Sequence, residues 1–284
     1  MKTLTCPAPA KLNLFLHVTG RRADGYHLLQ TLFRFIDLSD TLRFTVREDG
    51  EIHRVNVIDG VSSEQDLCVC AACLLQKEAA CKLGVDIELD KRIPMGGGLG
   101  GGSSDAATTL LALNHLWDLN LSRERLMQIG LTLGADVPVF IFGENAFAEG
   151  IGERLQAFSL PEAWYVVLIP PVHVPTARIF TNPQLTRNTI SFTIRALPIG
   201  GDFHTAQFAN DLQPTACALY PEIEQHLAWL AQFAPAMMTG SGACVFAEFA
   251  SEEAAKAVLK QLPENMRGVV AQGLPQHPLQ DFAK

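Results

Sequence analysis

The sequence predicts an α+β protein of 284 residues made of two parts. Short segments that alternate apolar and polar residues, as strands do, occur in both halves of the chain. Between them lie segments rich in Ala and Leu, which favour helices. Glycines at positions 143, 150 and 152 interrupt these patterns. A boundary near residue 155 is therefore expected, with one part over residues 1–155 and the other over residues 156–284.

The first part is expected to begin with a strand. Residues 3–15 are predicted to be extended, with prolines at positions 7 and 9, and the alternation becomes regular from residue 11 onward. It places Leu12, Leu14, Leu16 and Val18 on one face and Lys11, Asn13, Phe15 and His17 on the other. Asp24-Gly25 is typical of a hairpin turn, so the chain is expected to reverse there.

The sequence also indicates further strands and helices. Strands are expected at residues 42–46, 52–57, 85–89, 164–169, 244–249 and 269–272, and helices at residues 66–83, 122–134, 223–233 and 251–262. Residues 103–113 predict a further helix with Ser103 or Ser104 as its N-cap. The apolar run 137–142 fits either type of element. Residues 187–204 show little pattern and are expected to form a loop.

Composition limits the classes of partner. The net charge is −8 without any basic run, which disfavours binding to nucleic acid. No segment approaches the roughly 18 apolar residues that span a bilayer, so no membrane partner is expected. Pro7, Pro9 and Lys11 interrupt the segment where a signal peptide has its apolar core, which predicts a cytoplasmic location.

Four of the seven cysteines cluster at positions 68, 70, 73 and 81. The pair Cys70-x-x-Cys73 permits a metal site, but no second Cys pair or His pair supplies further ligands. The cluster lies in an expected helix rich in Ala and Leu, where Cys often serves as a small buried residue. We therefore predict core thiols in a reducing compartment.

The most informative segment is a glycine-rich run at the start of a helix. It comprises Pro94, Met95, Gly96, Gly97, Gly98, Leu99, Gly100, Gly101, Gly102, Ser103 and Ser104. Without a Cβ, glycine accepts positive φ and close approach of a ligand. Successive amides can then point into one concavity, and the helix N-terminus adds its own amides and dipole. The run is therefore predicted to bind phosphate.

Other glycine patterns fit this run less well. A P-loop requires Lys where Ser103 stands. The dinucleotide pattern is met by Gly96, Gly98 and Gly101, but the acid about 20 residues further on, Asp118, ends a helical stretch rather than a strand. The protein-kinase loop lacks its accompanying H-R-D and D-F-G motifs. A flexible linker would not be followed at once by a helix.

A second glycine-rich segment, Met238-Thr239-Gly240-Ser241-Gly242-Ala243-Cys244, precedes an expected strand. By itself it is typical of a tight turn. Beside a phosphate-binding loop it would serve as a buttress.

Three segments together resemble the three motifs of the GHMP small-molecule kinases. They are Pro9-Ala10-Lys11-Leu12-Asn13-Leu14, the run 94–104, and residues 239–243. The resemblance implies a two-lobed fold, with an N-terminal lobe like domain 2 of ribosomal protein S5 and a ferredoxin-like C-terminal lobe. It also implies ATP as phosphoryl donor, bound across the glycine loop, and a small-molecule substrate in the cleft between the lobes.

Residues 20–33, which include Asp24-Gly25-Tyr26-His27, resemble one branch of this family. That branch transfers the γ-phosphoryl group of ATP to the 2-hydroxyl of a diphosphocytidyl methylerythritol, on the non-mevalonate route to isoprenoids. Homoserine, mevalonate and galactose kinases are the alternatives within the family, and Tyr26-His27 argues against them. A regulatory nucleotide-binding module without catalysis is a further alternative, which the presence of Lys11 and Asp136 disfavours.

The resemblance implies two catalytic residues. Asp136, in Gly134-Ala135-Asp136-Val137-Pro138, would accept or orient the proton of the hydroxyl group. Lys11 would lie beside it, favour its ionised form and help to neutralise the transferred group. From the residues alone, Asp136 ahead of Pro138 is more typical of a helix N-cap, and Lys11 is more typical of a solvated strand face.

For substrate binding, the resemblance implies that Tyr26 stacks on cytosine, that His27 reads the hydrogen-bonding edge of the base, and that Phe180 covers the other face of the ring. Asn13 is expected to reach the same cleft as Lys11, because both lie on one strand face. From the residues alone, Tyr26 would be a surface residue and Phe180 a core residue.

Mg²⁺ is expected with ATP, because it neutralises phosphate charge and keeps several of its waters. Ser104 is the candidate for contact with the metal or the β-phosphate. Asp105 could reach the metal through water but is more typical of an acid in the first turn of a helix. No residue is assigned as a metal ligand, and the chain is expected to act as a monomer or weak homodimer.

Overall fold

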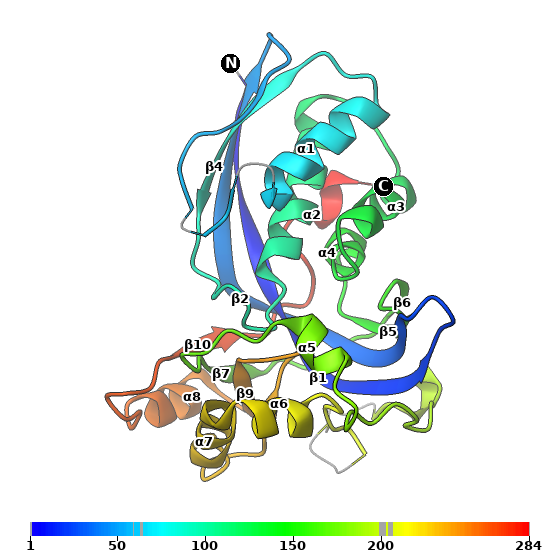
Figure 1. Ribbon diagram of the computed structural model, residues 1–284. Coiled ribbons are helices and arrows are strands. Elements are labelled where there is room, and N and C mark those ends of the chain that lie inside the picture. Colours follow the sequence, from blue (N-terminus) through cyan, green and yellow to red (C-terminus); the bar gives the residue numbers. More distant parts are fainter. Residues whose placement is uncertain (1, 59, 63–64, 199–202, 204–206, 284) are drawn as a thin grey trace.

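Two long antiparallel strands run through the whole molecule. The computed structural model describes residues 2–58, 60–62, 65–198, 203 and 207–283. In it, β1 (Thr3–Arg21) and β2 (His27–Arg47) pair along nearly their full length. They extend from the upper part of Figure 1 into the lower part. The chain reverses at residues 22–26, as Asp24-Gly25 predicted, and the strand expected at residues 42–46 is only the end of β2.

These two strands form the centre of a six-stranded sheet. The order is β3-β4-β2-β5-β6, with β1 pairing β2. The further strands are β3 (Ile52–Arg54), β4 (Gly84–Asp90), β5 (Ala146–Gly150) and β6 (Arg154–Ala157). The four strands expected in the N-terminal part, at residues 3–15, 42–46, 52–57 and 85–89, thus correspond to β1, β2, β3 and β4, whereas β5 and β6 were not predicted. The boundary near residue 155 stays a prediction.

An irregularity in β1 changes which side chains share a face. Asn13 pairs with Phe33 and Leu16 pairs with Thr31, so β1 has one more residue than β2 in this interval. Such a bulge re-aims the side chains that follow it. Phe15 therefore packs in the same apolar cluster as Leu14, and not on the opposite face as the alternation predicted.

Four helices cover one face of the large sheet (Figure 1). They are α1 (Leu67–Glu78), α2 (Gly101–Leu116), α3 (Arg123–Leu133) and α4 (Val137–Phe142). The core between helices and sheet includes Phe35, Phe44, Leu111 and Phe140. The helix expected over residues 66–83 ends at Glu78, because the chain turns at Ala80 with a φ of 48°.

The lower lobe is a four-stranded antiparallel sheet with helices on one face. Its order is β10-β7-β9-β8, and the chain passes through it as strand, helices, two strands, helix and strand. The strands are β7 (Trp164–Leu168), β8 (Ala236–Met238), β9 (Val245–Phe249) and β10 (Gly268–Gln272), and the helices are α5 (Thr176–Phe180), α6 (Gln213–Leu219), α7 (Pro221–Leu230) and α8 (Glu252–Leu259). This is the ferredoxin-like arrangement that the resemblance implied; α5, α6 and β8 were not predicted.

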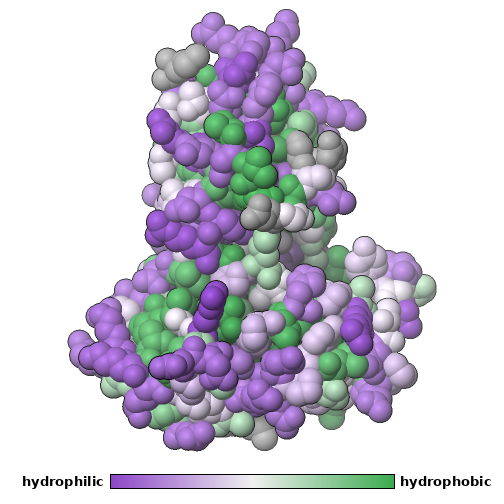
Figure 2. All heavy atoms as spheres, turned by 60° about the vertical axis from the view of Figure 1, so that its left-hand side comes forward, coloured by the Kyte–Doolittle hydropathy of each residue, from purple (hydrophilic) through white to green (hydrophobic). Residues whose placement is uncertain are grey.

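The two faces of the small sheet have different partners. Val166 and Val245 pack with α6, α7 and α8, whereas Tyr165 and Phe246 pack with Leu12 and other residues of β1 and β2. The long strands therefore belong to the cores of both lobes. In Figure 2 a narrower upper part stands on a broader lower part.

Residues 187–198 are mostly irregular, as expected, with one short 3-10 helix, η2 (Ile194–Ala196). The end of that expected loop, His204, lies outside the described residues. Within the described part of the chain, no helix has the length and apolar character needed to cross a membrane.

After β10 the chain returns to the upper lobe, where the C-terminus lies beside the helices (Figure 1). Asn145 holds this returning segment: its side chain accepts from the Phe35 amide at 2.8 Å and donates to the carbonyl oxygens of Leu274 and Pro275 at 2.9 and 3.1 Å. The short helix η3 (Gln280–Phe282) follows, with Leu279 in the core.

Replacing Asn145 with Ala should lower the free energy of unfolding by about 1–3 kcal/mol, because it leaves the buried Phe35 amide without its acceptor. Urea unfolding followed by circular dichroism measures the change. Gln232→Ala, at an exposed position, is the matched control and should stay within about 0.5 kcal/mol of the parent. Equal midpoints for both variants would contradict this role of Asn145.

Candidate active site

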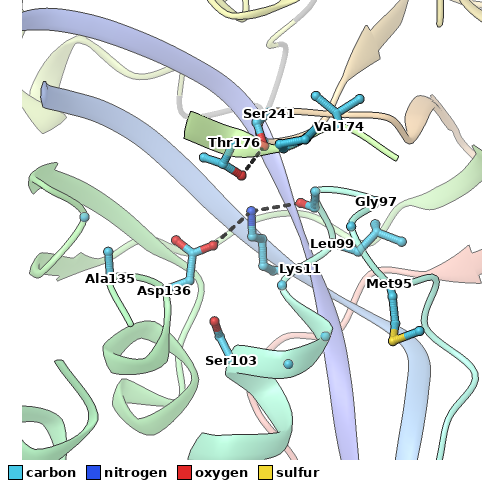
Figure 3. A pocket seen from close by; sticks show the side chains of 18 of the residues that line it. Lys11, Met95, Gly97, Leu99, Ser103, Ala135, Asp136, Val174, Thr176 and Ser241 are labelled. Atoms are coloured by element: carbon cyan, nitrogen blue, oxygen red, sulfur yellow. Dashed lines mark hydrogen bonds and ion pairs between the residues drawn. The ribbon is translucent and has the colours of Figure 1, made fainter. Parts of the chain in front are cut away.

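A cavity of about 1020 Å³ lies where the two lobes meet. Its walls come from β1, the glycine loop, the start of α4, α5 and the second glycine-rich segment (Figure 3). Of the residues predicted for the site, Lys11, Asn13, Tyr26, His27, residues 94–103, Asp136 and Phe180 line this cavity. Ser104 does not line it.

The glycine loop has the backbone that phosphate binding requires. Gly96, Gly98 and Gly100 have φ values of 68°, 75° and 72°, a region that only glycine enters readily. At Gly98, a Cβ would stand 2.2 Å from the carbonyl oxygen of Thr239. The first turn of α2 follows directly, and its amides have no partner within the helix. The loop therefore presents bare main-chain amides and a helix N-terminus to the cavity.

The start of α2 corrects the predicted N-cap. The helix begins at Gly101 with Gly100 as N-cap, three or four positions before the serines that were expected to cap it. Ser104 is fully buried, and its hydroxyl donates to the carbonyl oxygen of Pro9 at 2.7 Å. Ser103, one position earlier on the helix, is the serine that faces the cavity (Figure 3).

The second glycine-rich segment braces the first, as its position in the sequence suggested. The amide of Cys244 donates to the Gly97 carbonyl oxygen at 3.1 Å. The Thr239 hydroxyl donates to the Gly98 carbonyl oxygen at 3.4 Å. Asn210, which was not predicted, holds the segment by donating to the carbonyl oxygens of Met238 and Gly240 at 2.7 and 2.8 Å. The two loops thus form one connected floor for the cavity.

Lys11 lies at the centre of the site, and its side chain is 3% exposed. Its ammonium group donates to the Asn13 side-chain oxygen at 2.5 Å and to the Gly98 carbonyl oxygen at 3.0 Å. It lies 5.5 Å from the centre of the Phe33 ring. Lys11 is therefore not on a solvated strand face.

Asp136 stands opposite Lys11, with 3.5 Å between its carboxylate and the ammonium nitrogen (Figure 3). The residue is the N-cap of α4 by position, but its side chain makes no capping hydrogen bond. The carboxylate instead points to the cavity and is 38% exposed. The structure therefore brings the predicted pair together, with one partner buried and the other open to a ligand.

Asn13 has a positioning role besides lining the cavity. Its amide group donates to the Thr31 hydroxyl at 2.8 Å while its oxygen accepts from Lys11. The Thr31 hydroxyl in turn donates to the Phe15 carbonyl oxygen. This chain fixes which end of the Asn13 amide faces the ammonium group.

The aromatic side chains gather at another part of the cavity. Tyr26 follows the hairpin turn and is 61% exposed. The rings of His27 and Phe180 lie 4.9 Å apart with 34° between their planes. His27 also accepts a hydrogen bond from Arg187, which the sequence offered no signal to predict.

A group of charges that was not predicted lies near the start of α2, and two of its members, Lys91 and Asp105, line the cavity. Lys91 donates to Asp40 and, at 2.7 Å, to Asp105. The sequence predicted Asp105 in the first turn of the helix, but the residue lies beyond the first turn of α2 and is engaged by Lys91. Burial, with a smaller contribution from the charge of Asp40, raises the pKa of Asp105 to about 7 despite the nearby Lys91.

The cysteine cluster differs in part from the prediction. Cys68 is buried, as expected for a core thiol, but Cys73 is exposed and Cys81 is half-buried. No disulfide bond joins these cysteines in the described part of the chain, and within it no three His, Cys, Asp or Glu side chains group to form a metal site.

Comparison with known proteins agrees with this architecture. The family model "GHMP kinases N terminal domain" matches residues 66–144, and "GHMP kinases C terminal" matches residues 201–268. A 4-diphosphocytidyl-2-C-methyl-D-erythritol kinase of Nitrosospira multiformis is 60% identical over 284 residues, which cover 99% of this chain and 95% of the relative. One of Thiobacillus denitrificans is 61% identical over 276 residues, covering 97% of each chain.

A crystal structure of 4-(cytidine 5'-diphospho)-2C-methyl-D-erythritol kinase superposes with a TM-score of 0.81 at 34% identity, covering 95% of this chain and 99% of that one. The homoserine kinase of Cytophaga hutchinsonii shares the fold, with a TM-score of 0.72 at 17% identity over 98% of this chain and 96% of its own. The chain therefore belongs to the GHMP kinase family and, within it, to the 4-diphosphocytidyl-2-C-methyl-D-erythritol kinases.

Replacing Gly98 with Ala should weaken ATP binding at least about tenfold, because a non-glycine residue in the left-handed region costs about 1–2 kcal/mol even without a clash. The added Cβ would also push Thr239 away. Isothermal titration with ATP measures the effect. Gly20→Ala, whose Cβ would meet Leu28 at an ordinary 3.5 Å, is the control. Unchanged ATP affinity in the Gly98 variant would show that the loop does not hold the nucleotide.

Asp105 should make folding stability depend on pH. Because its pKa is raised in the folded protein from 3.8 to about 7, its contribution is fully present below about pH 4 and lost as the pH rises through 7. The unfolding free energy of the parent minus that of Asp105→Asn should therefore decrease between about pH 4 and pH 7 and then level off. Urea unfolding at several pH values measures this difference, and parallel curves would contradict it.

Proposed function

We propose that this chain transfers the γ-phosphoryl group of ATP to the 2-hydroxyl group of 4-diphosphocytidyl-2-C-methyl-D-erythritol. The observation that carries the proposal is one continuous cavity that holds three kinds of group: the bare amides of the glycine loop, the Lys11–Asp136 pair, and the aromatic cluster of Tyr26, His27 and Phe180. They suit, in turn, a triphosphate, a reacting hydroxyl group and a flat base. The sequence relatives support the same reaction.

The glycine loop is the part that holds the triphosphate. Its glycines carry no Cβ, so the main chain can approach phosphate oxygens closely. The N-terminus of α2 adds amides and the positive end of the helix dipole. Because the loop is braced by residues 239–244, these donors are in place before the ligand binds. Preorganised donors of this kind stabilise the charge that spreads over the transferred phosphoryl group.

Asp136 and Lys11 act on the reacting hydroxyl group. As the 2-hydroxyl oxygen bonds to the γ-phosphorus and the bond to ADP breaks, the hydroxyl proton passes to the Asp136 carboxylate. Lys11 offsets negative charge on the transferred group, and its ammonium is held in place by Asn13 and the Gly98 carbonyl. The greater exposure of Asp136 suits a group that must meet the substrate, whereas the burial of Lys11 suits a fixed charge.

Tyr26, His27 and Phe180 are the groups that recognise cytosine. Aromatic side chains stack on a base with little dependence on its exact position, so the base edge must be read by a polar group. His27 is the polar member of the cluster. This cluster favours the diphosphocytidyl substrate over those of homoserine, mevalonate and galactose kinases, which contain no nucleobase.

The donor set of the cavity fits Mg²⁺ carried by the nucleotide. Mg²⁺ keeps several waters and takes one or two carboxylates together with substrate phosphates. Asp136 lines the cavity with its side chain 38% exposed, and it would hold the ion through one of the ion's waters, which leaves the carboxylate able to accept the hydroxyl proton. When bound, Mg²⁺ neutralises charge on the β- and γ-phosphates.

Asp136→Asn should lower kcat by about 10²–10⁴-fold, because the amide cannot accept the hydroxyl proton. A coupled ADP-release assay with 4-diphosphocytidyl-2-C-methyl-D-erythritol measures the rate. Asp118→Asn, at an exposed carboxylate paired with Lys2 far from the cavity, is the matched control and should keep the parent rate. Absence of substrate-dependent ADP release by the parent would refute the proposed reaction, whereas a fully active Asp136 variant would remove only the role of Asp136.

A further inference from the structure

Arg187 makes a contact with His27 that decides where the imidazole carries its proton. The Nε–H of the guanidinium donates to Nε2 of His27 at 3.1 Å. A guanidinium group has donors only, so Nε2 must be the unprotonated, accepting nitrogen of the ring. In neutral imidazole the proton then belongs on Nδ1. The ring nitrogen that remains for a ligand is therefore a donor.

The loop that carries Arg187 is held independently of His27. The other guanidinium nitrogens donate to the carbonyl oxygens of Leu185, Phe180 and Asn182 at 3.0, 2.9 and 2.7 Å. Thr189, two residues further on, bonds to Val18 and Asp211. Arg187 is thus a fixed group that orients the His27 ring, and its bonds to His27 and to the Phe180 carbonyl tie both aromatic partners to one cation.

The charges around the ring favour its neutral form. Burial is the main cause that lowers the pKa of His27, and the nearby positive charges of Arg187 and Arg21 lower it further. A neutral ring is the form for which the position of the single proton matters, because it then has one donor and one acceptor.

The bases of pyrimidine nucleotides differ at the atom that such a donor would meet. Ring nitrogen N3 of cytosine accepts a hydrogen bond, whereas N3 of uracil carries a proton and donates. A donor at Nδ1 therefore pairs with cytosine and opposes uracil. A site built to pair with one hydrogen-bonding pattern rejects the other strongly, because the mismatched groups lose their water without gaining a partner.

We propose that Arg187 is a positioning residue that fixes the His27 proton on Nδ1 and thereby makes the site select a cytosine over a uracil nucleotide. This inference rests on the proposed function, in which His27 reads the base. Arg187 acts only through His27 and Phe180 and does not itself carry the reaction.

The first test is independent of turnover. In the ¹⁵N-labelled protein without ligand, long-range ¹H–¹⁵N spectra should show Nδ1 of His27 protonated and Nε2 unprotonated. In Arg187→Met, the Nε2-protonated form should become the major one. A parent protein with its His27 proton on Nε2 would overturn the inference, whether or not the variant folds.

The second test measures base selection with CDP and UDP as competitors of the substrate. In the parent, CDP should inhibit more strongly than UDP. In Arg187→Met the ratio of the two inhibition constants should shrink by at least about tenfold, because Nδ1 of His27 would then accept a hydrogen bond, which suits N3–H of uracil and not N3 of cytosine. KM for the cytidine substrate should rise while kcat changes little. Arg178→Met, which removes a neighbouring guanidinium bonded to Tyr220 and not to His27, is the matched control and should keep the ratio.

The two mutations together separate positioning from general support. In a His27→Asn background, Arg187→Met should cause no further loss of selectivity between CDP and UDP, measured as the ratio of their inhibition constants. The imidazole ring whose tautomer Arg187 controls is then absent. A further loss of the same size as in the parent would show that Arg187 merely supports the loop, and would overturn the inference. If the parent forms no ADP with the diphosphocytidyl substrate, the proposed function fails, and the tautomer measurement still reports on Arg187.

Discussion

The candidate active site is assembled around one buried positive charge, the ammonium group of Lys11. A charge removed from water is costly unless other groups replace the lost hydration. Here the replacements come from separate elements: Asn13 on the same strand, the Gly98 carbonyl on the glycine loop, and Asp136 at the start of α4. Because each must reach the same nitrogen, the positions of loop and helix relative to β1 are tied to the charge that is proposed to act in the reaction.

The long strands explain how one cavity can serve a long substrate. β1 carries Lys11 and Asn13 in its middle, and the hairpin at its end carries Tyr26 and His27. The same strands pack against the helices of the upper lobe and the sheet of the lower lobe, so both ends of the cavity lie on one pair of strands. Phe180 and the loop of Arg187 approach from the lower lobe and complete the end where the base is proposed to bind.

Much of this organisation could be predicted from the sequence, because it depends on local patterns of residues. Local patterns predicted the strands at 85–89, 164–169 and 244–249. The helices expected to start at residues 66 and 122 do start there, with Asp66 and Ser122 as their N-caps. The glycine run was recognisable because backbone freedom at successive positions has few uses other than ligand approach. Where a local rule was wrong, a longer-range contact was the cause: Ser104 does not cap α2, because its hydroxyl is bonded to Pro9, 95 residues away.

The sequence by itself determined the two-part α+β class and predicted the phosphate-binding loop, because both are encoded in neighbouring residues. The roles proposed for Lys11 and Asp136 came from the resemblance of their motifs to a known family. Only the tertiary structure decided that these two groups lie 3.5 Å apart, that Lys91 joins Asp40 to Asp105, and that Arg187 holds His27. Those contacts join residues 14 to 160 positions apart. No local periodicity records such a pairing, since it depends on how whole strands and helices pack.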